Sequence, residues 1–243
     1  MKIRFAIRRR AILLPSLLLL RLLLLPSIVA APGLVLAQRA QPVPAPGPPE
    51  LAQLAQLAQL AHSLRQGGLV LLLRHAETEP GVGDPAGFRA DDCPTQRNLN
   101  EAGRAQARRL GQWFRQHGIA PTRVLTSPWC RTRETASLAF GGAADWVPLS
   151  NLIADRSRQA EHAREVRDAI ARVGPQDLVV LVSHGVTIDA FVGEYLRQGE
   201  LVIIRPAPAA AAARRGPAGT TPDTRAEPHD GHAVETVGRL MVP

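Results

Sequence analysis

Short aliphatic runs alternate along this chain with longer segments whose apolar residues recur at helical spacing. Residues 69–73 and 178–182 are unbroken aliphatic runs, as expected of strands that are buried on both faces of a sheet. Residues 98–117 have aromatic side chains at offsets of 3 and 4 from Leu110, which predicts a helix with one buried stripe. The same criteria predict further strands at 123–126, 146–149, 201–204 and 234–242, and further helices at 128–140, 159–172 and 186–196.

This alternation of strands and helices predicts a three-layer α/β/α sandwich with a mainly parallel central sheet. The last predicted strand, 234–242, is expected to return beside 201–204. Between them, residues 206–233 are dominated by Ala, Pro, Gly, Arg and Asp, so we expect a disordered insertion there. We assign one domain to residues 50–243, because 66–243 alone provide 178 residues, enough for one substantial core.

Two local signals predict individual helices and their ends. The triplet Leu-Ala-Gln, repeated three times from Leu51, predicts one short helix that packs on the domain and ends at Gly67. Leucine at every third position drifts by about 60° per step around a helix, so a coiled coil is not expected. A later helix is expected to begin at Ser127 as N-cap, with Pro128 at the first helical position.

The N-terminal segment has the features of a secretory signal. Residues 1–37 combine a basic start, an apolar stretch at 11–25 and a small residue, Ala37, at a cleavage position. An uncleaved inner-membrane anchor is the alternative, although Arg21 within the span would cost roughly 2.5–3.5 kcal/mol. In both cases we expect the domain to lie in the periplasm. Residues 38–49 contain five prolines and are predicted to be an extended linker.

The net charge does not indicate nucleic-acid binding. The formal charge is +8, but residues 1–37 hold six basic residues and no acid, which leaves 23 basic against 21 acidic residues in the rest. The two cysteines, Cys93 and Cys130, lie 37 positions apart and form no CxxC motif, so no structural metal site is expected. Export to an oxidising compartment favours a bridge between them. Two free thiols are the alternative.

The most informative residues follow the predicted strands. Arg74 and His75 come directly after one buried aliphatic run, and His184 follows the other. Ligands of open α/β sheets bind outside the carboxyl ends of the strands, so we expect both imidazoles to face one crevice. Arg131, in the first turns after a third strand, adds a second guanidinium. Each residue alone has a structural explanation, but two arginines, two histidines and a helix N-terminus together suit a phosphoryl dianion.

Four motifs in this order resemble those of the histidine phosphatase superfamily, which has the phosphoglycerate mutase-like fold. They are LRHAET at 73–78, NLNEAGRAQA at 98–107, TSPWCRTRETA at 126–136 and SHG at 183–185. Within the superfamily, GDPAGF at 83–88 and QRNL at 96–99 resemble an exported bacterial branch similar to the lipopolysaccharide core heptose phosphatases.

The resemblance implies catalytic roles for four of these residues. It makes His75 the nucleophile that becomes phosphohistidine, while Arg74, Arg131 and His184 bind the phosphoryl oxygens. It implies no cofactor and no metal. An attacking imidazole must be neutral, and neighbouring guanidinium groups lower its pKa, which agrees with this role.

The family's acidic proton donor has no clear counterpart here. In the family this donor usually follows the third strand. The first acidic residue after the predicted third strand, 146–149, is Asp155, which is therefore our candidate catalytic acid. Glu161, Glu77 and Asp84 are the other carboxylates that we consider.

The sequence thus predicts a periplasmic phosphatase that hydrolyses a phosphomonoester or phosphoramidate through a phosphohistidine intermediate. Its expected partner is a small-molecule or glycan phosphate, with no nucleic acid, and with membrane contact only through the signal or anchor segment. A catalytically silent binding protein for a phosphorylated glycan or lipid headgroup is the alternative function.

Overall fold

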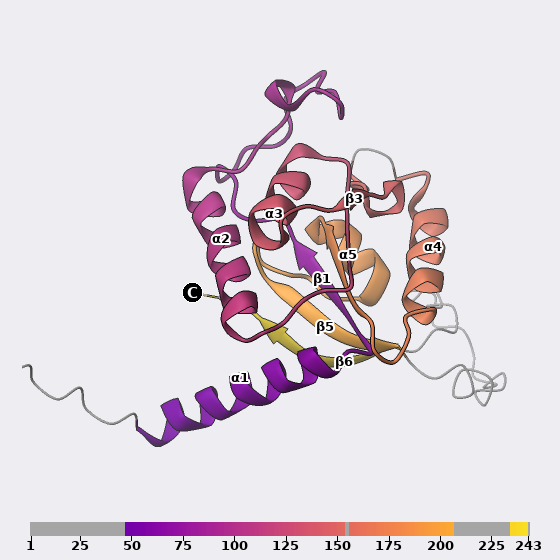
Figure 1. Ribbon diagram of the computed structural model, residues 1–243. Helices are drawn as coiled ribbons and strands as arrows, with labels where there is room; N and C mark the ends of the chain where they lie inside the picture. The colour runs from indigo at the N-terminus through magenta and orange to yellow at the C-terminus, as the bar shows by residue number, and fades with distance from the viewer. Residues whose placement is uncertain (1–46, 154–155, 207–233, 243) are drawn as a thin grey trace, which may run out of the picture. The chain divides into compact units, whose positions relative to one another are not determined.

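The computed structural model describes residues 47–153, 156–206 and 234–242. They contain a six-stranded sheet of order β3-β2-β4-β1-β5-β6 (Figure 1). Strands β1 to β4 pair in parallel, whereas β5 pairs antiparallel with β1 and with β6. The predicted mainly parallel sheet is therefore confirmed. The strands are β1 (Leu69–Arg74), β2 (Arg123–Thr126), β3 (Ala144–Asp145), β4 (Leu178–Ser183), β5 (Leu201–Pro206) and β6 (Val234–Leu240).

Helices cover both faces of this sheet, which confirms the predicted α/β/α layers. Side chains alternate along a strand, so Leu71 of β1 packs in a cluster with residues of the first three helices, while Leu72 packs in a second cluster with residues of the other two. The helices are α1 (Pro48–Gln66), α2 (Glu101–Gln116), α3 (Cys130–Phe140), α4 (Gln159–Ala171) and α5 (Gly185–Val192).

Helix α1 is longer than the Leu-Ala-Gln repeat and packs through one half only. Ala61 and Leu64 are buried, whereas Leu51 and Leu54 are 53% and 55% exposed. The helix begins at Pro48, so the last two positions of the predicted linker are helical. The predicted signal at 1–37 and most of the linker lie outside the described residues. Within the described part of the chain, no helix is long and apolar enough to cross a membrane.

The C-terminal hairpin has the predicted arrangement. Strand β6 pairs antiparallel with β5, so the chain returns to the sheet after the predicted insertion. Residues 207–233 of that insertion lie outside the described residues.

Two predicted elements around β3 and α5 are wrong in their limits. The strand expected at 146–149 is instead the two-residue β3 followed by a 3-10 helix at Val147–Leu149. Pro148 has no backbone N–H and cannot continue the strand ladder. The helix expected at 186–196 ends at Val192, because Gly193 adopts a left-handed φ of 70° that closes its last turn.

Candidate active site

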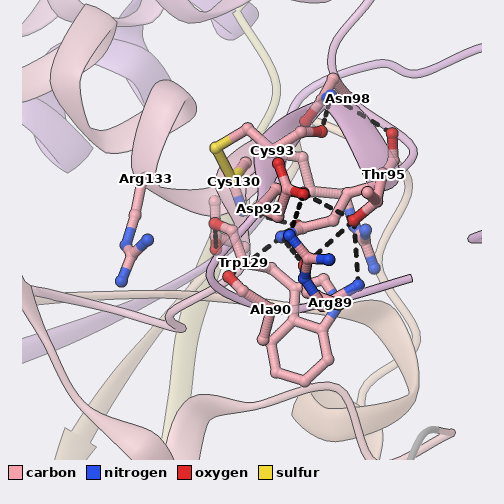
Figure 2. The surroundings of a disulfide bond; sticks show 12 residues. Arg89, Ala90, Asp92, Cys93, Thr95, Asn98, Trp129, Cys130 and Arg133 are labelled. Atoms are coloured by element: carbon pink, nitrogen blue, oxygen red, sulfur yellow. Dashed lines mark hydrogen bonds and ion pairs between the residues drawn. A yellow bond between two sulfur atoms is a disulfide. The ribbon is translucent and has the colours of Figure 1, made fainter. Parts of the chain in front are cut away.

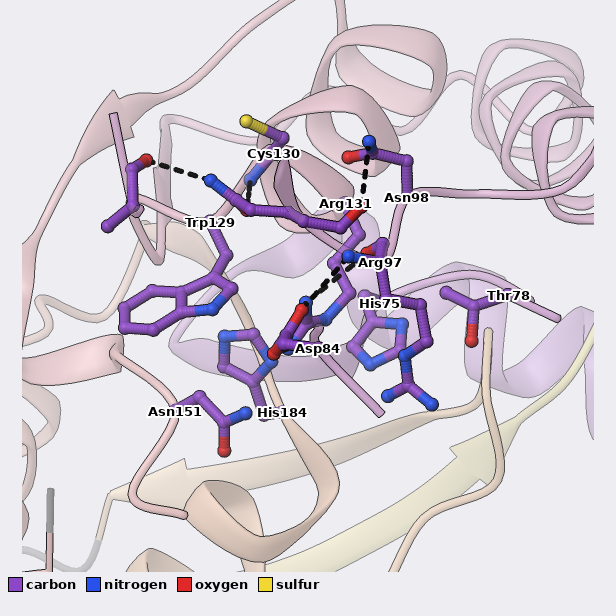
Figure 3. A network of polar contacts seen from close by, with 12 residues as sticks. His75, Thr78, Asp84, Arg97, Asn98, Trp129, Cys130, Arg131, Asn151 and His184 are labelled. Carbon is purple, nitrogen blue, oxygen red and sulfur yellow. Dashed lines mark hydrogen bonds and ion pairs between the residues drawn. The ribbon is translucent and has the colours of Figure 1, made fainter. Parts of the chain in front are cut away.

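The two histidines lie together because their strands are adjacent and parallel. Arg74 of β1 and Ser183 of β4 are register partners, so the next residues, His75 and His184, emerge at the same edge of the sheet. The His75 backbone N–H donates to the Ser183 carbonyl at 3.0 Å, which extends the pairing into the site. The two ring centroids are 5.5 Å apart, and both side chains are buried (Figure 3).

His75 is held in one tautomer and is uncharged. Its Nδ1 atom lies 2.8 Å from the carbonyl oxygen of Ala76. A carbonyl only accepts hydrogen bonds, so Nδ1 carries the proton and Nε2 keeps its lone pair. Burial, and then the charges of Arg131 and Arg74, lower the pKa of His75 to about 3. A ring with this pKa is neutral, and therefore nucleophilic, throughout the physiological pH range.

Arg131 is fully buried and pairs with Asp84. The Nη1 and Nη2 atoms of Arg131 donate to the two carboxylate oxygens of Asp84 at 2.7 and 3.1 Å, and Nη1 also donates to the Arg97 carbonyl at 3.3 Å. Burial lowers the pKa of Arg131, while the pairing with Asp84 raises it. The ion pair thus maintains a cation in a site that water does not solvate.

Arg74 lies beside the start of α5. Its Nη1 atom donates to the Leu196 carbonyl at 2.7 Å, and its Cζ atom lies 5.4 Å from the centre of the Tyr195 ring. A Cβ atom at Gly185 would lie 3.1 Å from that Cζ. The close approach explains why a residue without a side chain follows His184.

His184 is oriented by a hydroxyl group. Its Nε2 atom lies 2.8 Å from the Ser127 Oγ atom, and its ring makes an edge contact with the Trp129 ring at 5.6 Å between centroids. Because Ser127 is engaged in this way, it does not cap α3, which begins later, at Cys130, with Trp129 as N-cap. The predicted helix start at Ser127 and Pro128 is therefore wrong.

Several buried nitrogen atoms of the site have no hydrogen-bond partner in the protein. Unpartnered buried donors are rare and call for an explanation. Here they belong to His184 and to arginine and tryptophan side chains of the site, where anion oxygens would satisfy them. No group of three His, Cys, Asp or Glu that would hold a metal ion occurs among the described residues. The unpartnered atoms are Arg74 Nε, Arg97 Nε, Arg131 Nε, Trp129 Nε1 and His184 Nδ1.

A disulfide joins the loop before α2 to the start of α3. Cys93 and Cys130 are bridged with their Cα atoms 5.6 Å apart, so the structure has the bridge and not two free thiols (Figure 2). The Gln96 side chain strengthens the same junction, because its Oε1 atom accepts from the Cys130 N–H at 3.0 Å. The bridge thus fixes the loop directly beside Arg131.

The carboxylates considered as proton donors occupy different places. Asp155 lies outside the described residues. Glu161 forms an exposed ion pair on α4, and Glu77 accepts a hydrogen bond from the Asn100 side chain at 3.2 Å. Only Asp84 is described in contact with the arginines of the site.

Sequence reasoning missed two residues that the structure adds to the site, Arg97 and Trp129, which lie around the two imidazoles (Figure 3). Asp84, which the sequence suggested only as a possible proton donor, lies there too. The charge of Arg97 contributes to the lowered pKa values of His75 and His184. The QRNL motif pointed to Arg97, but the position of Arg97 beside the two histidines depends on how the loop folds.

Comparison with known proteins gives one family match. A model of the histidine phosphatase superfamily (branch 1) matches residues 70–153, the segment that carries Arg74, His75 and Arg131. No curated protein matches the sequence at a significant level.

Solved structures with similarity to this chain include three bacterial proteins. A putative phosphohistidine phosphatase SixA from Agrobacterium tumefaciens is 24% identical, with a TM-score of 0.41, over 56% of this chain and 91% of its own. An open-reading-frame product of Mycobacterium tuberculosis is 18% identical, with a TM-score of 0.45, over 69% and 95%. A mycobacterial glucosyl-3-phosphoglycerate phosphatase is 17% identical, with a TM-score of 0.43, over 57% and 93%. Over residues 70–153, this chain is thus similar to members of the histidine phosphatase superfamily.

Proposed function

We propose that this chain is a phosphatase that transfers the phosphoryl group of a phosphomonoester or phosphoramidate to His75 and then to water. One observation carries the proposal: a neutral imidazole of fixed tautomer lies among five buried nitrogen atoms that have no partner in the protein. A tetrahedral dianion would supply oxygen acceptors for those nitrogens and place its phosphorus near the lone pair of His75.

The reaction would proceed in two displacements. In the first, His75 Nε2 attacks phosphorus, an N–P bond forms, and the bond from phosphorus to the leaving oxygen or nitrogen breaks. In the second, water attacks phosphorus, the N–P bond breaks, and inorganic phosphate leaves the restored imidazole. Arg74 and Arg131 would stabilise the negative charge on the equatorial oxygens in both transition states, a task that metal ions perform in other phosphoryl-transfer enzymes.

The leaving group needs a proton unless it is already a stable anion. Asp155 remains our proposed donor because it is the first acid after the third strand. A substrate with a good leaving group would depend on this donor less than an alkyl phosphate would.

We also propose that the enzyme acts in the periplasm. The signal-like residues 1–37 support this location, and so does the bridge between Cys93 and Cys130, since disulfides persist in oxidising compartments. The substrate that we propose is a small-molecule or glycan phosphate in that compartment. The GDPAGF and QRNL motifs favour heptose phosphates of lipopolysaccharide. Membrane contact would be confined to the signal or anchor segment.

Phosphate release decides between turnover and silent binding. We would measure it for the wild type and for His75→Ala with sugar phosphates, lipid A fragments and phosphoproteins, and trap acid-labile phosphoenzyme. Turnover and trapped phosphate that both disappear in His75→Ala support the proposal. Binding of phosphate without turnover of any substrate would support the silent binding protein instead.

Two inhibitors test the chemistry of the same step. EDTA should leave activity unchanged, because arginines would take the part of the metal. Vanadate should inhibit, because it mimics the pentacoordinate phosphoryl group. Activity that disappears with EDTA and returns with zinc or manganese would contradict the mechanism.

A further inference from the structure

Asp84 makes the most extensive set of contacts with the site arginines of any carboxylate in the described ranges. We propose that Asp84 is a positioning residue that aims Arg131 at the phosphoryl group, an inference that rests on the proposed phosphatase function. Its side chain is 12% exposed, and that of Arg131 is 0% exposed. Both oxygens of Asp84 accept hydrogen bonds from the guanidinium, so the pair is bidentate.

Asp84 binds only one edge of the Arg131 guanidinium, so the donors on the other edge remain available to a ligand. A guanidinium presents one edge formed by Nη1 and Nη2 and another formed by Nε and Nη2. Asp84 binds the first edge of Arg131. The Nε atom on the second edge is buried and has no partner. A phosphoryl group can therefore bind the second edge while Asp84 stays in place.

Asp84 also ties Arg131 to the loop that carries Arg97. Its Oδ1 atom accepts from the Arg97 backbone N–H at 3.1 Å, in addition to the bond from Arg131. The Arg97 carbonyl in turn accepts from Arg131 Nη1 at 3.3 Å. One carboxylate thus fixes the backbone of one arginine and the side chain of another.

Two other roles for Asp84 predict different behaviour. As proton donor, it would need a free acidic hydrogen, but both of its oxygens accept hydrogen bonds from Arg131. As an internal anion that competes with substrate, it would need to occupy every binding edge of Arg131, but the Nε edge has no partner. The geometry therefore favours positioning.

The variant Asp84→Asn separates the three roles. It keeps the shape of the side chain but removes the charge and one acceptor. We expect kcat/KM to fall by about tenfold to hundredfold, the effect of one charge-assisted hydrogen bond, and to fall equally for p-nitrophenyl phosphate and for glycerol phosphate. Vanadate binding, measured by calorimetry, should weaken by a similar factor. Asp84→Glu, which keeps the carboxylate, should recover part of the loss.

Each contrary result identifies another role. A loss confined to glycerol phosphate, whose leaving group needs a proton, would make Asp84 the proton donor. Tighter vanadate binding would make it a competing anion. Asp91→Asn is the matched control, because Asp91 lies on the same loop with its side chain 88% exposed and should behave as wild type. Circular dichroism melts of all variants establish that each one is folded.

A double-variant comparison tests whether Asp84 acts through Arg131. In an Arg131→Ala background, Asp84→Asn should change vanadate affinity by less than about twofold, because the group that it aims has gone. A full additional loss would contradict the inference. If the wild type hydrolyses no phosphate ester, the proposed function fails, while the vanadate measurements still decide whether Asp84 positions Arg131.

Discussion

Ser127 and His184 are joined side chain to side chain, with 2.8 Å between Oγ and Nε2, and both residues are fully or almost fully buried. Ser127 follows β2 and His184 follows β4, and these two strands are parallel neighbours. The sheet therefore places a hydroxyl where it fixes the ring of the second histidine. When the hydroxyl donates to Nε2, the unpartnered Nδ1 carries the proton and can donate to a phosphoryl oxygen.

Ser127→Ala should lower kcat/KM by about twofold to tenfold. The hydrogen bond that it removes is worth about 0.5–1.5 kcal/mol, and its loss frees the His184 ring to adopt the other tautomer. Steady-state kinetics with p-nitrophenyl phosphate would measure the change. Ser137→Ala, at an exposed position of α3, is the matched control and should retain full activity. Equal kinetics for the two variants would mean that Ser127 does not orient the ring.

Gly185→Ala should weaken phosphoryl binding without unfolding the protein. The added methyl would lie 3.1 Å from both Cζ and Nη1 of Arg74, so the guanidinium must move away from its bond to the Leu196 carbonyl. We expect a higher KM and weaker vanadate binding. Alanine is a better helix former than glycine, so α5 itself should not be destabilised.

A matched substitution separates this effect from a general effect of alanine. At Gly83, a Cβ atom meets nothing within 4 Å, so Gly83→Ala should leave KM unchanged. A KM for Gly185→Ala that equals the wild-type value would show that Arg74 adjusts without cost.

The two site histidines should make the protein less stable in acid. Burial and the charge of Arg131 lower the pKa of His75 to about 3 and hold that of His184 well below its usual range. In the unfolded chain both rings have the ordinary histidine pKa of ~6.5. The unfolded state therefore binds more protons below this pH, and the free energy of unfolding falls as the pH drops toward about 3.

Urea unfolding between about pH 4 and pH 7 would measure this dependence. His75→Asn removes one of the two titrating rings and should flatten the slope, because the carboxylates contribute equally to both proteins. Identical slopes for the variant and the wild type would contradict the lowered pKa of His75.

The strands that carry the two histidines were visible in the sequence for a physical reason. A strand buried on both faces must be aliphatic throughout, so the runs at 69–73 and 178–182 stood out, and the topological rule for parallel sheets then placed His75 beside His184. These inferences need only local patterns and one rule about strand ends.

The remaining parts of the site depend on contacts between distant residues. Ser127 has the local features of an N-cap, but its hydroxyl bonds to His184, 57 positions away. Asp84 reaches Arg131 across 47 positions, through a loop that has no periodic pattern. Local propensity cannot specify such pairs, because tertiary contacts decide between the alternatives that it allows.

The bridge between Cys93 and Cys130 leads to the final prediction. Denatured protein that has been prepared without a reducing agent should contain no free thiol, whereas two free thiols per chain would contradict the bridge. Closing this loop, with a sequence separation of 37 residues, should stabilise the protein by about 4 kcal/mol in the chain-entropy view. The variant in which both cysteines are serine should therefore unfold at lower urea concentration.

The same double variant should also change function. The bridge adjoins Arg131, and Asp84 lies on the loop that it anchors. We therefore expect a higher KM and weaker vanadate binding even at low temperature, where the variant is fully folded. If only stability changed, with KM unaltered, the hydrogen bond between Gln96 and the Cys130 N–H would suffice to hold the loop. The disulfide beside Arg131 would then have a structural role alone.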